Sequence, residues 1–312
     1  MSADRIATFA VSERLDRKGL AAIFASFVFW GLVPLYWHAL NALPSLLIIG
    51  HRIVWSTLLV VGWLWVREGL GWLRQIRARP NALRNLAISG LLIGLNWGLY
   101  IWAINTDHVV ESSLGYFINP LLSVLLGVLV LRERLNRVQW IAVSCAAAGV
   151  VWLTCQAGAP PWIALSLASS FALYGLVRKL VAVDPVGGLA VENLYLLLPA
   201  MALLVWGELG HGGGFVHDWG FGIDAMLIAG GAVTALPLVG FAYGVRRIPL
   251  SVVGLVQYIS PTLQLVIGVV VLGEPFDRTR AMGFAAIWLG LLLFAGDGLL
   301  RARGAARDAA GA

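Results

Sequence analysis

Ten apolar runs, each long enough to cross a bilayer as a helix, dominate this sequence. A hydrocarbon core about 30 Å thick requires roughly 20 apolar residues in an α-helix. Every backbone polar group must also be satisfied inside lipid, and the runs lack the alternation of a barrel strand, so we expect helices. The predicted spans are 20–39, 43–66, 83–104, 111–131, 138–155, 161–179, 188–206, 224–245, 249–272 and 278–297.

The composition agrees with a chain whose surroundings are mostly lipid. Of 312 residues, 60% are hydrophobic and 12% are charged, whereas a soluble domain is about half apolar and about a quarter charged. This composition excludes an ordinary cytosolic enzyme, a disordered chain and a secreted disulfide scaffold. The two cysteines, Cys145 and Cys155, lie in one apolar run and predict neither a disulfide framework nor a metal site.

The basic residues predict the orientation of the chain in the membrane. Nineteen of the 22 Lys and Arg residues fall in segments that are cytoplasmic if the N-terminus is inside, whereas the outer loops hold only Arg278 and Arg280. Cytoplasmic loops carry such an excess of Lys and Arg, so we expect both termini in the cytoplasm. The same bias explains the net charge of +6, and no nucleic-acid partner is expected.

An internal repeat divides the chain into two halves. Shifted by 141 positions, segment 114–137 aligns with 255–278, and ten of the 24 positions are identical, Pro120 with Pro261 among them. Each half contains five spans, and because five is odd the second half enters the membrane inverted. Inverted repeats are typical of secondary transporters; a duplication kept only for packing is the alternative.

We therefore predict an all-α integral membrane protein with ten transmembrane helices in two inverted five-helix repeats. The predicted divisions are a cytoplasmic N-terminal segment 1–19, the repeats 20–155 and 161–297, and a cytoplasmic tail 298–312.

Several segments carry a resemblance to a known family. They are WGLVPLYWHAL (30–40), HRIVW (51–55), NWGLYIWAIN (96–105), ESSLGYFINPL (111–121), FALYGLVRK (171–179) and QYISPTLQ (257–264). In order and spacing they resemble the RarD branch of the EamA family, within the drug/metabolite transporter superfamily. The resemblance implies a bacterial inner-membrane protein with two inverted halves around a central cavity. Relatives export amino acids and other small metabolites, and the branch is linked by name to chloramphenicol sensitivity.

Four polar residues interrupt two of the predicted spans. His51 and Arg52 lie in the second span and Glu192 and Asn193 in the seventh, at positions that the 141-residue shift superimposes. Ionisable groups inside a membrane are costly and commonly functional. His51 and Glu192 are therefore candidates for proton-titratable gates, and Arg52 for the anchor of a substrate carboxylate. The alternative is a structural network between these spans, such as an ion pair of Arg52 with Glu192.

Three prolines lie inside predicted spans beside polar or aromatic residues. Pro34, Pro120 and Pro261 each remove a backbone donor and kink a helix. Lipid tolerates this where side chains or cavity water satisfy the freed carbonyls, which favours a site in mid-membrane over curvature for packing alone. The further cavity-lining candidates are Trp55, Asn96, Trp97, Tyr116, Asn119, Tyr174, Tyr243, Gln257, Tyr258 and Gln264.

Seven of the 14 tryptophans are assigned to span ends or loops, where aromatic belts at the membrane surface place them without a substrate role. Trp37 is assigned to such a belt. Trp30, Trp55, Trp97 and Trp102 remain as cavity candidates.

One motif of soluble enzymes is present, HGGG at 211–214, but no G-x-S-x-G accompanies it and it lies in a predicted outer loop, so we interpret it as a connector. We find no Walker loop, metal-ligand cluster or nucleophile pair, so we expect no enzyme, catalytic residue, metal or cofactor. We expect a secondary transporter that exports small amphipathic metabolites, such as apolar or aromatic amino acids, by alternating access. The expected partners are this substrate and membrane lipid, and a monomer is plausible. The alternatives are a drug or metabolite exporter with proton coupling through His51 and Glu192 and, more remotely, a membrane-embedded enzyme or a non-transporting subunit.

Overall fold

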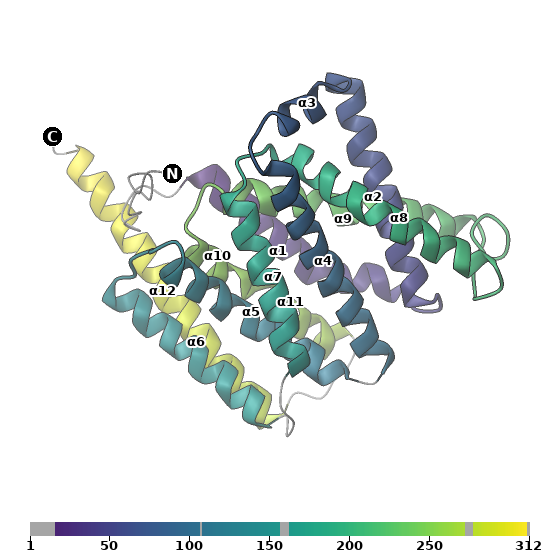
Figure 1. Ribbon diagram of the computed structural model, residues 1–312. Helices are drawn as coiled ribbons and strands as arrows, with labels where there is room; N and C mark the ends of the chain where they lie inside the picture. Colours follow the sequence, from purple (N-terminus) through teal and green to yellow (C-terminus); the bar gives the residue numbers. More distant parts are fainter. Residues whose placement is uncertain (1–15, 107, 157–161, 272–276, 311–312) are drawn as a thin grey trace.

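The computed structural model describes residues 16–106, 108–156, 162–271 and 277–310, whose regular structure is helical (Figure 1). The first half contains α1 (Arg17–His38), α2 (Ser45–Glu68), α3 (Gly71–Arg77), α4 (Ala82–Asn105), α5 (Val109–Leu129) and α6 (Arg137–Gln156). The second half contains α7 (Trp162–Leu180), α8 (Pro185–Glu208), α9 (Phe221–Val245), α10 (Leu250–Gln257), α11 (Ile259–Val266), the π-helix η2 (Ile267–Val271) and α12 (Arg278–Ala310).

The prediction of a helical membrane protein is confirmed. Within the described residues, nine segments are long and apolar enough to span a membrane, and a tenth, shorter apolar segment, Leu114–Leu129, lies in α5. One of the nine, Leu250–Val271, comprises α10, α11 and the π-helix. The short α3, which the hydropathy pattern did not predict, joins α2 to α4 at one extremity of the molecule (Figure 1).

Side-chain caps fix the beginning of two spanning helices. Asp16 Oδ1 accepts hydrogen bonds from the backbone N–H groups of Lys18 and Gly19 at the start of α1. Asp184 caps α8 in the same way, and Pro185 occupies the first turn of that helix. These caps satisfy donors that have no partner inside the helix, and proline is favoured at a first helical position because its missing donor costs nothing there.

The ninth predicted span, 249–272, is broken rather than continuous. The backbone leaves the α-helix at Tyr258, between α10 and α11, and ends in the π-helix. Pro261 has no N–H with which to bond the carbonyl of Gln257 four residues earlier, so the helix is weakest at that point. The equivalent Pro120 lies inside α5, which continues as one helix. The two halves therefore differ at this pair of prolines.

The most extensive helix packing joins one half of the chain to the other. Equivalent helices pair across the halves, as α2 with α8, α5 with α10 and α6 with α12, the last pair lying side by side in Figure 1. The other large contacts occur in matched sets. The contact of α5 with α7 corresponds to the contact of α11 with α1. In the same way, α1 packs on α9 as α7 packs on α4, and α2 packs on α9 as α8 packs on α4. Exchange of the halves thus reproduces the contact pattern, as two inverted repeats require.

Tertiary hydrogen bonds gather several basic turns at one end of the bundle, which we call the basic end. Nε of Arg247, just after α9, lies 3.6 Å from Oδ2 of Asp16 at the start of α1. Lys179 Nζ, near the end of α7, donates to the carbonyl oxygens of Val245 and Ile248, at 3.0 and 2.5 Å. The start of α1 and the ends of α7 and α9 therefore meet at this end, and the turn from α1 to α2 lies at the opposite end.

The largest buried apolar cluster fills the half of the bundle next to the basic end. It combines residues from α1, α2, α3, α4, α7, α8, α9 and α10 and from the turns that follow α7 and α9. Its members include Ile23, Val60, Leu64, Trp72, Ile76, Val245 and Ile248, all less than 9% exposed. The packing is dense here, and the larger cavity of the protein lies in the other half.

Candidate functional site

A cavity of about 630 Å³ lies between the two halves of the bundle. Residues of α1, α2, α4, α5, α7, α9, α10 and α11 line it, so both repeats contribute. A volume of this size matches the clefts that hold small organic molecules. In the described part of the chain, the lining draws nothing from α6, α8 or α12.

The cavity reaches the surface at the end opposite the basic end. Its lining includes His38, the last residue of α1, and Asn41 in the turn from α1 to α2, and both residues are exposed. At its other limit the lining ends at buried residues such as Phe27 and Leu238, which belong to the large apolar cluster. The structure is therefore open at one end and closed at the basic end.

Arg52 supplies the charge of the cavity. Its guanidinium carbon lies 4.6 Å from the ring centre of Trp37 and 4.9 Å from that of Trp97, within the range of a cation–π contact. Arg52 Nε donates to Thr234 Oγ1 at 3.1 Å. Among the described residues, no carboxylate lines the cavity or forms an ion pair with Arg52. The arrangement therefore holds a positive charge between two aromatic rings without an anionic partner.

Other polar side chains of the lining are hydrogen-bonded within the protein. Asn96 Nδ2 donates to the Leu167 carbonyl oxygen at 2.8 Å and to Ser170 Oγ at 2.9 Å, which ties α4 to α7. Gln264 Nε2 donates to the Trp30 carbonyl oxygen at 3.3 Å and so joins α11 to α1. These amides fix the walls of the cavity.

Asn119 differs from these amides. Its side chain is 4% exposed and lines the cavity, and its Oδ1 has no hydrogen-bond partner. Buried polar atoms are nearly always paired with protein or water. The neighbouring Gln257 is also buried, and its Oε1 accepts from Ser123 Oγ at 3.5 Å. Asn119 Oδ1 is therefore an unpaired acceptor in the wall of the cavity.

Aromatic rings form the closed end of the cavity. Trp30 lies 5.8 Å from Phe171 and 5.4 Å from Phe27, centre to centre, and all three line the cavity. Behind them Tyr174 stacks on Phe241 at 5.9 Å. Such rings provide a broad apolar surface with weakly polar edges, suited to the apolar part of an amphipathic molecule.

Seven of the predicted site residues line the cavity together with two of the predicted prolines. They are Arg52, Asn96, Trp97, Tyr116, Asn119, Gln257 and Gln264, with Pro34 and Pro261. Outside the lining lie His51, Trp55, Tyr174, Glu192, Asn193, Tyr243, Tyr258 and Pro120. Trp37, which is assigned to a membrane belt from the sequence, also lines the cavity, and its ring contacts Arg52. Its position near a span end fits both roles.

Glu192 belongs to a separate buried network. Its Oε1 lies 3.4 Å from Arg178 Nη1, the side chains being 1% and 2% exposed. Ser89 Oγ donates to Glu192 at 2.5 Å, and the Tyr174 hydroxyl donates to it at 3.5 Å. The partner of Glu192 is thus Arg178 rather than Arg52. This pair was not predicted from the sequence.

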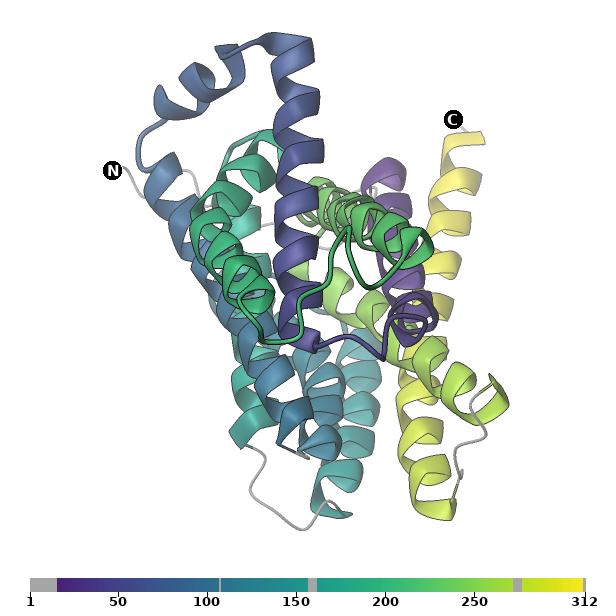
Figure 2. The same cartoon turned by 90° about the vertical axis from the view of Figure 1, so that its right-hand side faces the viewer.

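His51, on α2, contacts the turn between α8 and α9, and this turn passes across α2 in Figure 2. Trp55 Nε1 donates to His51 Nδ1 at 3.3 Å. The rings of Phe215 and Trp219, from that turn, lie 4.8 and 5.9 Å from the imidazole. The imidazole is therefore surrounded by aromatic side chains.

Two of the other predicted residues outside the lining connect helices. Asn193 Nδ2 donates to Ser56 Oγ at 2.8 Å, and the Tyr258 hydroxyl donates to the Phe117 carbonyl oxygen at 3.2 Å. The Tyr243 ring lies beneath the guanidinium of Arg247 near the basic end.

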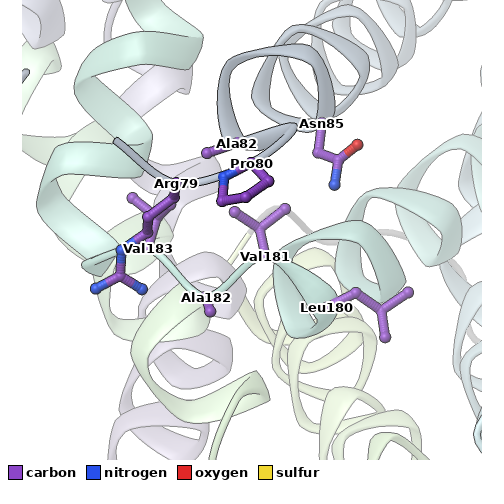
Figure 3. A pocket seen from close by; sticks show the side chains of 8 residues that line it. All are labelled: Arg79, Pro80, Ala82, Asn85, Leu180, Val181, Ala182 and Val183. Carbon is purple, nitrogen blue, oxygen red and sulfur yellow. The ribbon is translucent and has the colours of Figure 1, made fainter. Parts of the chain in front are cut away.

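A second cavity of about 320 Å³ lies beside the turn before α4 and the turn between α7 and α8. Figure 3 shows Pro80 against Val181, with Arg79 and Asn85 pointing to opposite sides. Ligand sites bring a few polar groups together on one point, and these two diverge. The central cavity is therefore the candidate site.

Known proteins resemble this chain over most of its length. Residues 17–155 and 161–296 each match the EamA-like transporter family. Protein RarD of Streptomyces exfoliatus is 43% identical over 293 residues, which cover 94% of this chain and 92% of that protein. Protein RarD of Escherichia coli K12 is 37% identical over 94% of this chain and 99% of its own length. The uncharacterized transporter YojE of Bacillus subtilis is 44% identical over 89% of this chain and 93% of its own length.

A solved protein structure has the same fold. It superimposes with a TM-score of 0.67 at 20% identity, covering 91% of this chain and 98% of that chain. The matches agree with the helical membrane architecture and with the family that the sequence segments resemble. This multi-pass membrane chain belongs to the EamA-like transporter family, as a RarD-like member.

Proposed function

We propose that the chain is a secondary transporter of the bacterial inner membrane. It exports small amphipathic metabolites, apolar or aromatic amino acids among them, by alternating access. The observation that carries this proposal is the cavity of about 630 Å³ between the inverted halves, in which aromatic walls surround Arg52 and a few polar groups. Inverted repeats provide two mirrored arrangements around one site, and the similar proteins include chains named as transporters.

The orientation follows from the basic residues. With the basic end in the cytoplasm, both termini are cytoplasmic and the cavity opens to the outside. The large apolar cluster then forms the barrier on the cytoplasmic side. In the mirrored state the helices of the two halves exchange their contacts, and the barrier forms at the outer end.

The solute gradient is the proposed source of energy. The sequence lacks an ATP-binding motif. The two titratable candidates for proton coupling make contacts outside the cavity: Glu192 pairs with Arg178, and His51 packs against Phe215 and Trp219. Neither His51 nor Glu192 lines the cavity, so we favour facilitated export over proton antiport. Stoichiometric proton uptake during solute flux would contradict this choice.

Flux through proteoliposomes tests the proposed function. Purified protein is reconstituted, and counterflow of labelled phenylalanine and of other aromatic solutes is recorded. Arg52→Gln and Trp97→Ala are expected to reduce the flux strongly, because they remove the charge and one aromatic wall. Trp140→Ala, on the exposed face of α6, is the matched control and is expected to retain the wild-type flux. If no amphipathic solute crosses faster than in empty liposomes, the proposal fails.

A further inference from the structure

The charge of the central cavity is unbalanced. Arg52 is the one permanently ionised side chain of the described lining, and the aromatic and aliphatic residues around it cannot compensate its charge. A buried charge without a partner is costly. An occupant that brings a single negative charge neutralises the site, whereas a cationic occupant adds to the imbalance.

The contacts of Arg52 define where an anion binds. Thr234 accepts the hydrogen bond of Nε, and the guanidinium lies over the rings of Trp37 and Trp97. The two terminal amino groups therefore remain for a ligand. A carboxylate fits both at once, because guanidinium and carboxylate form two parallel hydrogen bonds. The aromatic rings at the closed end accept the apolar body of the same molecule.

Asn119 adds a second requirement. Its Oδ1 is buried and has no partner, although the side chain lines the cavity. A carbonyl oxygen accepts and cannot donate, so a matching ligand presents an N–H or O–H group there. A neutral donor satisfies this oxygen without bringing a positive charge into the field of Arg52.

We propose that the cavity selects organic monoanions, each with an aromatic or apolar body, one carboxylate for Arg52 and one neutral hydrogen-bond donor for Asn119. Such anions bind more tightly than zwitterions with the same body, and organic cations bind least. This inference rests on the proposed function and narrows it, since amino acids at neutral pH are zwitterions. The described lining offers a zwitterion's ammonium no carboxylate.

Three matched probes separate the charge classes. Phenyllactate, phenylalanine and phenylalaninol share one body; they carry a carboxylate with a hydroxyl, a carboxylate with an ammonium, and an ammonium without a carboxylate. Their affinities for the full-length protein in nanodiscs at pH 7 are measured by calorimetry. Phenyllactate and phenylalanine share the carboxylate, so the difference between their affinities reports the ammonium, which Arg52 repels and for which the described lining offers no carboxylate. Repulsion between like charges in such a site changes an affinity by about tenfold. We expect phenyllactate to bind about tenfold more tightly than phenylalanine, and phenylalaninol to bind more weakly still.

Two variants assign the ranking to its residues. Arg52→Gln is expected to remove the preference for the anion, whereas Arg74→Gln, at an exposed position on α3, keeps it. Asn119→Leu is expected to weaken the affinity for phenyllactate about fivefold, which corresponds to the loss of one neutral hydrogen bond. The same variant leaves 3-phenylpropionate, which lacks the hydroxyl, nearly unchanged.

The outcomes distinguish the inference from the proposed function. Equal binding of the three probes, tighter binding of phenylalanine or phenylalaninol, or no binding of phenyllactate at millimolar concentration would each overturn the anion selectivity. Flux of phenylalanine without any preference for the anion would overturn the selectivity and leave the transporter intact. The expected ranking in an otherwise flux-inactive protein would support the selectivity and overturn the transport.

Discussion

Removing the charge of Glu192 is expected to destabilise the fold substantially. The carboxylate lies 3.4 Å from Arg178 Nη1, with both side chains almost fully buried. At an effective dielectric constant of about 20, two unit charges at this separation interact with about 5 kcal/mol. Breaking a buried pair by removing one partner costs about 3–5 kcal/mol, because the other charge stays buried and unpaired. We therefore expect Glu192→Gln to lower the free energy of unfolding by about 3–5 kcal/mol.

An exposed pair in the same protein provides the control. Arg247 and Asp16 lie 3.6 Å apart, nearly the same separation, but their side chains are 37% and 40% exposed. In bulk water the same charges interact with about 1 kcal/mol, and side-chain entropy offsets part of it. Because Asp16 also caps α1, the ion pair is broken by replacing its arginine, in Arg247→Gln. This variant is expected to cost less than about 1 kcal/mol.

The assay is reversible unfolding in mixed micelles, followed by tryptophan fluorescence during a titration with dodecyl sulfate. The double variant Arg178→Met with Glu192→Gln completes the cycle. It removes both charges, so it is expected to recover most of the loss of the single variant, as replaced buried pairs often do. Two results would refute the reasoning: wild-type stability of Glu192→Gln, or a double variant that is less stable than the single variant.

Two further variants test the packing of the helices. Glu133 accepts hydrogen bonds from the backbone N–H groups of Leu250 and Ser251, at 2.6 and 2.8 Å, and so caps α10 from the turn after α5. Glu133→Gln is expected to cost about 1–2 kcal/mol of unfolding free energy, measured by the same titration. A Cβ atom at Gly290 would lie 2.5 Å from the Ala142 carbonyl oxygen. Gly290→Ala is therefore expected to push α12 from α6 and to cost about 1–3 kcal/mol, measured as a lower unfolding midpoint.

Each of these variants has a neighbouring control. Arg134→Gln changes an exposed residue beside Glu133, and Gly298→Ala fills open space on α12. Both are expected to change the stability by less than about 0.5 kcal/mol. If a control and its test variant lose the same stability, the loss does not come from the cap or from the close helix contact.

The helices were predictable from the sequence because crossing a membrane is a local requirement. Each run had to be apolar over about 20 residues to satisfy its backbone in lipid, and this does not depend on the neighbouring helices. The break in the ninth span, by contrast, could not be predicted from the local sequence. Pro261 and Pro120 are equivalent in sequence, yet only the second half separates into α10 and α11. The surrounding contacts decide whether a proline bends a helix or ends it.

The side chains of the site were less predictable, because their direction depends on helix rotation. His51 and Arg52 are adjacent, and successive residues point about 100° apart on a helix. Arg52 consequently faces the cavity, whereas His51 faces the turn between α8 and α9. The partner of Glu192 could not be predicted from the sequence either. Arg178 lies at the end of the preceding helix, and only the tertiary fold makes it a buried partner.

Alternating access to the central cavity is the main claim, and cysteine labelling from the two sides of the membrane tests it most directly. Tyr116 lines the cavity and is 39% exposed. Tyr116→Cys is placed in a background without Cys145 and Cys155, and an impermeant thiol reagent is applied to right-side-out and to inside-out vesicles. Trp140→Cys, on the outer face of the bundle, is the control.

We predict that the cysteine at position 116 reacts from both sides of the membrane, and that a transported solute slows the labelling. The control cysteine at position 140 lies outside the cavity and is expected to show neither labelling from both sides nor protection by the solute. Labelling from one side alone, or no labelling from either side, would contradict a cavity that opens in turn to the two sides.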